Sequence, residues 1–192
     1  TLSFYQKKII LFPGRLTSWK GHEMFIESLN IFKQKNPDKL FFAIILGSDQ
    51  GRKIYKKKIQ RLVEQYRLIK DILFIDNCAK MPLAYKISNM VVNCSIEPES
   101  FGRVAIESQA MEKVIVASDI GGSKETIIDN KTGFVFKAGD AIALSDKLAH
   151  IFELNETTLK SMGIEGRKNV IKKFNVEKMC FSTYSEYIKL IS

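Results

Sequence analysis

The sequence has 192 residues, 45% of them hydrophobic, which is enough to bury a sizeable core and indicates one domain spanning residues 1–192. Thirty Lys and Arg against 21 Asp and Glu give a net charge of +9, which favours an anionic partner such as a nucleotide, a phosphate, nucleic acid or acidic lipid. Three cysteines without a CxxC pair argue against a disulfide framework or a zinc site, and no apolar run approaches the ~18–20 residues needed to cross a bilayer.

Short apolar runs alternate along the chain with amphipathic segments. The runs predict strands at residues 8–12, 40–46, 72–75, 90–94, 114–117 and 133–136. The segments predict helices from about residue 21, at 52–67, at 82–88, at 102–111, near 125, at 141–153, at 157–173 and at 176–190, the last with Asn175 as its N-cap. This order indicates an α/β fold with a Rossmann-like, doubly wound parallel sheet.

Ligands of such a sheet bind beyond the carboxyl ends of its strands. The candidate loops are residues 13–20, 47–52, 76–80, 95–103 and 117–122. The first of them reads PGRLTSWKG to residue 21 and places Arg15 and Lys20 between a strand end and a helix start, where backbone N–H groups already favour an anion. A diphosphate suits this loop, although two solvated surface cations would give the same spacing.

The stretch EPESFGRVAIESQA, residues 97–110, repeats this arrangement after a later strand. Gly102 allows the backbone to approach a ligand, and the N–H groups that begin the next helix can receive an anion. Glu99 lies in the loop and Glu107 in the helix, and carboxylates accept hydrogen bonds from sugar and ribose hydroxyls. The spacing alone is weak, because ordinary acidic helices produce it often. The glycine-bearing segment 118–125 would, by itself, indicate only a tight connection.

Four segments in the same order resemble a known family. They are PGRLTSWKG (13–21), SIEPESFGRVAIESQAM (95–111), VIVASDIGGSKET (114–126) and DNKTGFVFKAGD (129–140). Together they are similar to the C-terminal, donor-binding domain of the retaining GT-B glycosyltransferases related to glycogen synthase and sucrose synthase, glycosyltransferase family 4. The resemblance covers nearly the whole chain. It departs from the family pattern at residues 112–114, where Gly-x-Pro is usual, so the preceding helix must end without glycine.

The resemblance implies a role for each matching residue. Arg15 and Lys20 would bind the diphosphate of a UDP- or GDP-linked sugar and stabilise the leaving group in place of a metal, so that no cofactor is needed. Glu99 would hold the donor sugar, Glu107 the ribose, and Cys78 would lie near the base. The remaining donor-binding residues would be Gly14, Ser100, Phe101, Gly102, Arg103 and Val104.

The resemblance also implies a second domain, an N-terminal acceptor-binding half that this sequence does not contain. The helix within residues 175–192 would pack toward that domain. We therefore expect this chain alone to bind a donor but transfer no hexosyl unit. A glycan or lipid-linked acceptor, lipopolysaccharide or other envelope synthesis, and a cytoplasmic position, soluble or peripheral to the anionic inner face of the plasma membrane, are the accompanying expectations.

Other functions fit the residues less well. A glycoside hydrolase needs an acid and a base or nucleophile on opposite sides of one bond, and a dinucleotide-dependent dehydrogenase needs GxGxxG after the first strand, where this chain has PGRLTS. A basic Rossmann-like module that binds a nucleotide or nucleic acid without transferase activity stays open as the alternative. His22 and His150 fit structural roles better than catalytic ones, and Trp19 could either stack on a ligand or cover the loop.

Overall fold

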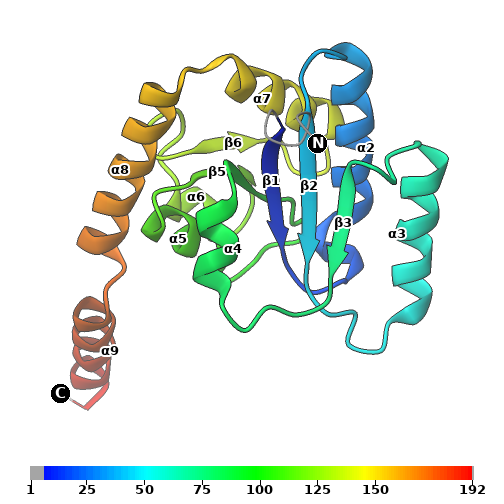
Figure 1. Ribbon diagram of the computed structural model, residues 1–192. Helices are drawn as coiled ribbons and strands as arrows, with labels where there is room; N and C mark the ends of the chain where they lie inside the picture. The colour runs from blue at the N-terminus through cyan, green and yellow to red at the C-terminus, as the bar shows by residue number, and fades with distance from the viewer. Residues whose placement is uncertain (1–6, 192) are drawn as a thin grey trace.

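The computed structural model describes residues 7–191, which form one six-stranded parallel sheet with helices on both faces (Figure 1). The strands are β1 (Lys8–Pro13), β2 (Phe41–Leu46), β3 (Ile72–Ile75), β4 (Met90–Asn93), β5 (Val114–Ser118) and β6 (Phe134–Phe136). Their spatial order is β3-β2-β1-β4-β5-β6, with every neighbouring pair parallel. This confirms the predicted doubly wound fold class.

The strands are apolar throughout because the sheet is covered on both faces. Successive residues of β1 show the alternation: Ile10 and Phe12 pack into the core on one face, and Leu11 packs into the core on the other. A continuous apolar run is the pattern expected of a strand buried on both sides. The same alternation extends the two cores across β2, β4 and β5.

The helices divide between the two faces. One face is covered by α2 (His22–Lys35), α3 (Lys53–Gln65) and α7 (Ala141–Glu153), and the other by α4 (Met81–Ile87) and α5 (Arg103–Ala110), with α6 (Ser123–Thr126) and α8 (Glu156–Lys173) beside α5. A short 3-10 helix, η1 (Ser18–Lys20), precedes α2 and was not predicted. All other elements lie close to the bounds that the sequence predicts.

The terminal helix α9 (Val176–Ile191) extends away from the sheet (Figure 1). Asn175 caps it as predicted, because its side-chain oxygen accepts a 2.8 Å hydrogen bond from the backbone N–H of Lys178. The helix buries none of its described residues, and Phe181, Leu190 and others remain exposed. Within residues 7–191, no helix combines the length and apolar character needed to cross a membrane.

The end of α5 shows the cost expected from its missing glycine. Glu112 adopts a positive φ of 57°, a left-handed conformation that side chains disfavour and that glycine adopts freely. The backbone N–H of Lys113 then closes the helix on the carbonyl of Ser108 at 2.9 Å. The turn therefore keeps the C-cap geometry usual for glycine, although Glu112 is strained in that conformation.

The sheet reverses its winding between β1 and β4, which lie side by side while their connections run in opposite directions. The loops that follow these two strands therefore diverge and leave a crevice at the carboxyl edge of the sheet. Gly21 fixes the distance between them. Its φ is 76°, and an added Cβ would overlap the carbonyl oxygen of Cys94. The N–H of Ile96 also donates to the carbonyl of Trp19 at 2.8 Å.

We predict that Gly21→Ala destabilises the protein more than Gly51→Ala does. Both glycines have positive φ, so each alanine carries a backbone penalty of about 1 kcal/mol, but no atom lies within 4 Å of a Cβ added at Gly51. The overlap with Cys94 should add roughly 1–3 kcal/mol to the Gly21 variant. Urea unfolding of both variants and the wild type measures the difference, and equal losses would contradict this account of the close approach.

Candidate functional site

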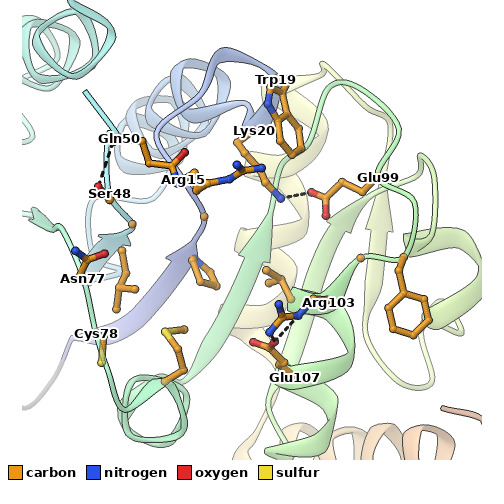
Figure 2. A pocket seen from close by; sticks show the side chains of 18 of the residues that line it. Arg15, Trp19, Lys20, Ser48, Gln50, Asn77, Cys78, Glu99, Arg103 and Glu107 are labelled. Carbon is orange, nitrogen blue, oxygen red and sulfur yellow. Dashed lines mark hydrogen bonds and ion pairs between the residues drawn. The ribbon is translucent and has the colours of Figure 1, made fainter. Parts of the chain in front are cut away.

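A pocket of about 670 Å³ opens at the carboxyl ends of β1 to β4 (Figure 2). Its walls come from the loops after these four strands, from α4 and from the first turns of α5. The pocket is lined by every residue to which the family resemblance gives a role: Gly14, Arg15, Lys20, Cys78, Glu99, Ser100, Phe101, Gly102, Arg103, Val104 and Glu107. The winding of the sheet thus brings together side chains from segments that are far apart in the sequence.

Lys20 and Glu99 form an ion pair that joins the β1 loop to the β4 loop. Their side chains are 9% and 12% exposed, so little water screens the attraction. The Lys20 ammonium also lies 4.6 Å from the centre of the Trp19 ring, which lines the same pocket. Figure 2 shows both members of the pair reaching into the space between the loops. The pair supplies one cation and one acid at the same point.

Arg15 enters the pocket from the same loop as Lys20 but is exposed. In the part of the chain that the structure describes, its guanidinium makes no hydrogen bond or ion pair. The loop beneath it is fixed, since the N–H of Leu16 donates to the carbonyl of Ser48 at 3.0 Å and an added Cβ on Gly47 would overlap the carbonyl oxygen of Gly14. A fixed backbone therefore presents an unpaired fork of N–H donors to the pocket.

Glu107 is held on the opposite wall by two neighbours. One carboxylate oxygen accepts from Arg103 Nη2 at 2.9 Å, and the other accepts from the Tyr85 hydroxyl at 2.8 Å. Burial, together with the adjacent Glu107 charge, raises the pKa of Tyr85 above its ordinary value, so the hydroxyl keeps its proton and donates. The first oxygen also accepts from Arg103 Nε at 3.2 Å, so it is the oxygen facing Tyr85 that retains a further lone pair for a ligand hydroxyl.

The glycine-bearing loop at 118–125 supports the pocket without lining it. Cβ atoms added to Gly121 and Gly122 would lie 2.5 Å from the carbonyl oxygen of Glu99 and 2.6 Å from the carbonyl carbon of Phe101. The N–H of Gly122 donates to the Glu99 carbonyl at 2.8 Å. Residues 117–122, one of the candidate loops, therefore supply no lining residue, and their glycines pack against the backbone of the β4 loop as in a tight connection.

Sequence reasoning missed several residues that line the pocket. They are Ser48, Gln50, Met81 and Tyr85. Tyr85 lies on α4, whose apolar pattern indicates only packing, and its contact with Glu107 joins residues that are 22 positions apart. No spacing in the sequence predicts a contact between Tyr85 and Glu107. Ser48 and Gln50 lay in a loop that was predicted to face the site, but short polar residues of that kind occur in most loops.

The histidines, for which structural roles were expected, lie outside the pocket. His22 is fully buried beneath the β1 loop, where its ring packs against Phe12 with centroids 4.6 Å apart and its Nδ1 lies 3.3 Å from the Thr17 carbonyl. Burial lowers the pKa of His22 to about 4, and Lys20 adds to the effect while the Thr17 carbonyl opposes it. A neutral, enclosed ring suits packing rather than proton transfer. Within residues 7–191, no group of three His, Cys, Asp or Glu side chains converges as a metal site would require.

Comparison with known proteins places these features in context. A family model described as "Glycosyl transferases group 1" matches residues 2–169. A D-inositol 3-phosphate glycosyltransferase of Corynebacterium glutamicum is 27% identical over 155 residues, which cover 80% of this chain and 37% of that protein.

Two solved structures share the fold. A glycosyltransferase from Rickettsia africae is 33% identical with a TM-score of 0.89, covering 97% of this chain and 48% of that one. Anabaena Alr3699/HepE, solved in complex with UDP and glucose, is 22% identical with a TM-score of 0.85, covering 97% and 50%. The chain therefore spans half or less of the length of these relatives.

We predict that His22 makes stability depend on pH in mildly acidic solution. Its folded pKa of about 4 lies below the ordinary 6.5, so the unfolded chain binds a proton that the folded chain refuses. The resulting stability is complete above pH 6.5 and falls by about 3 kcal/mol as the pH drops toward 4. Proton NMR of His150→Gln, which leaves His22 as the only histidine, should show a ring that titrates near pH 4. A ring that titrates near 6.5 would contradict this.

Proposed function

Because this chain belongs to the glycosyl transferases group 1 family, we propose that it is the donor-binding half of a retaining GT-B glycosyltransferase of family 4 that transfers a hexosyl unit from a UDP- or GDP-linked sugar. The observation that carries the proposal is the pocket itself, in which an unpaired arginine, a paired lysine and two anchored carboxylates meet. Its volume of about 670 Å³ lies in the range of small-molecule sites, roughly 300–1,000 Å³. Family membership favours this over a basic nucleic-acid-binding module.

The diphosphate is proposed to lie between the β1 loop and the start of α5. Arg15 would chelate its oxygens, Lys20 would add a second positive charge, and Gly14 would allow the backbone to approach. The N–H groups of residues 100–104 would receive sugar or phosphate oxygens. When the bond to the sugar breaks, negative charge grows on the departing phosphate, and fixed cations stabilise it most effectively. This arrangement would make a metal unnecessary.

The sugar and the nucleoside are proposed to lie on either side of the diphosphate. Glu99 would hold donor-sugar hydroxyls near the reacting carbon, and Glu107 would accept hydrogen bonds from the ribose hydroxyls. The base would then lie near Cys78, which is half-buried in the pocket wall. UDP accompanies the Anabaena protein of the same fold, which makes it the first nucleotide to test.

The acceptor is proposed to bind a second, N-terminal domain of a longer protein. The chain covers only 37% and 48% of two of its relatives, and α9 carries exposed apolar residues that such a domain could cover. The chain alone would then bind the donor and transfer no sugar. A glycan or lipid-linked acceptor in lipopolysaccharide or related envelope synthesis, at the cytoplasmic face of the inner membrane, completes the proposal.

We predict that Arg15→Ala weakens UDP binding by about tenfold or more, because each charge-assisted contact to phosphate contributes about 1.5–3 kcal/mol. Arg15 is exposed and has no partner to disturb, unlike Lys20, whose loss would strand Glu99. Isothermal calorimetry of wild type, Arg15→Ala and the control Arg61→Ala, an exposed arginine of α3 outside the pocket, makes the comparison. Equal affinities for UDP, and likewise for GDP, would remove the proposed phosphate contact.

We predict that the protein prefers UDP to 2′-deoxy-UDP and that Glu107→Ala loses most of the preference. The missing hydroxyl would leave the Glu107 carboxylate without one of its partners, which corresponds to about tenfold in affinity. Competition binding with the two nucleotides measures the ratio. Glu97→Ala serves as the control, since this neighbouring acid does not line the pocket. A ratio near one in the wild type would place the ribose elsewhere.

A further inference from the structure

We propose that Asn93 and Ser95 are positioning residues for Glu99, which they hold in a hydrogen-bonded chain so that one carboxylate oxygen stays free for the donor sugar. This inference rests on the donor site proposed above. It concerns residues that do not line the pocket, and it comes from the way in which their polar atoms are arranged beneath it.

The Ser95 hydroxyl lies between two oxygens. It makes a hydrogen bond with Glu99 Oε1, and its Oγ lies 3.1 Å from Asn93 Oδ1. A serine hydroxyl has one proton to donate. With one acceptor oxygen on each side, only one of the two can receive this proton. The Asn93 Nδ2 group, meanwhile, is buried without a hydrogen-bond partner among residues 7–191.

Turning the Asn93 amide by 180° resolves both difficulties. The amide nitrogen and oxygen of asparagine have nearly the same shape, so the hydrogen-bond network decides which is which. In the turned orientation Nδ2 donates to Ser95 Oγ, and the Ser95 proton goes to the Glu99 carboxylate. The group left without a partner is then a carbonyl oxygen, which tolerates that condition better than an N–H group. The hydrogen bonds then all donate in the same direction, from Asn93 to Ser95 and from Ser95 to Glu99.

The hydrogen bonds from Asn93 through Ser95 fix one side of the Glu99 carboxylate. Oε1 receives the Ser95 hydroxyl and the Lys20 ammonium, whereas Oε2 makes no hydrogen bond to any residue that the structure describes. A carboxylate held by both a cation and a hydroxyl has little freedom to rotate. Its second oxygen is therefore presented in a defined direction, which is what binding a particular sugar hydroxyl requires.

The backbone that carries Asn93 and Ser95 is held in place by the sheet and by Ser118. Asn93 is the last residue of β4 and pairs with Ala117 of β5 in the parallel register. The Ser118 hydroxyl donates to the Ser95 carbonyl at 2.7 Å. The side chains of Asn93, Ser95 and Ser118 are all buried. Glu99 thus takes its orientation from the centre of the sheet, although it lies in a loop.

Ser118 provides the control that separates positioning from stability. It is as buried as Ser95, and its hydroxyl contacts the same residue, but it touches only the backbone carbonyl. Ser118→Ala should lower stability while leaving the hydroxyl chain intact. Ser95→Ala removes the link to Glu99, Asn93→Leu removes the donor that orders it, and Ser95→Thr retains the hydroxyl.

The experiment is calorimetry of these variants with UDP and UDP-glucose, and with GDP and GDP-mannose. We expect Ser95→Ala to lower the affinity for a sugar nucleotide by about tenfold relative to its own diphosphate, Asn93→Leu to lower it by less, and Ser118→Ala and Ser95→Thr to leave the ratio unchanged. An unchanged ratio in Ser95→Ala overturns the inference, as does a wild type in which neither sugar adds affinity. A wild type that binds neither UDP nor GDP overturns the proposed function instead.

A second measurement tests the hydrogen-bond chain without any ligand. In the proposed orientation the Asn93 side-chain NH₂ points at Ser95, so its NMR signal should show a contact with the Ser95 methylene protons and should shift in Ser95→Ala but not in Ser118→Ala. An Asn93 signal that is insensitive to Ser95→Ala would overturn the chain even if sugar binding had changed.

Discussion

The ion pair between Lys20 and Glu99 joins the two loops on which the pocket depends. Each loop follows one of the strands at which the sheet changes its winding direction, and a backbone hydrogen bond from Ile96 to Trp19 holds the two loops side by side. The pair is nearly dry, so separating the charges would leave each of them poorly solvated. Its surroundings are therefore built to keep it closed: Gly21 brings the loops together, and Gly121 and Gly122 support the acidic side.

The charged side chains around this pair lie on two opposite walls of the pocket. Lys20 is paired with Glu99, whereas Arg15 has no partner among the described residues, so Arg15 is the cation more available to an incoming anion. On the other wall, Glu107 is balanced by Arg103 and held by Tyr85. A ligand with a charged middle and hydroxyl groups at both ends matches this arrangement, and a nucleotide sugar has that form.

The fold could be predicted almost completely from the sequence, because buried parallel strands leave continuous apolar runs that glycine and polar residues interrupt. The convergence of the strand-end loops followed from the same pattern. The contacts of Tyr85, Asn93 and Ser95 could not be predicted, since they depend on which strands are neighbours and on their register. The support that the loop at 118–125 gives to the β4 loop could not be predicted for a related reason. A glycine that allows a ligand to approach and a glycine that allows another loop to approach look alike in a sequence. In the structure the backbones of Glu99 and Phe101 lie against Gly121 and Gly122, so these glycines are of the second kind.

Helix α9 is attached to the body through a capped turn at Asn175, and it places a row of aromatic and aliphatic side chains in water. Solvent order around such a row is released whenever two copies meet, whatever their orientation. Self-association of the isolated polypeptide is therefore expected to start at the sixteen residues of α9 rather than at the covered sheet. The concentration at which solutions of the polypeptide turn cloudy is therefore expected to depend on a helix that supplies no residue to the pocket.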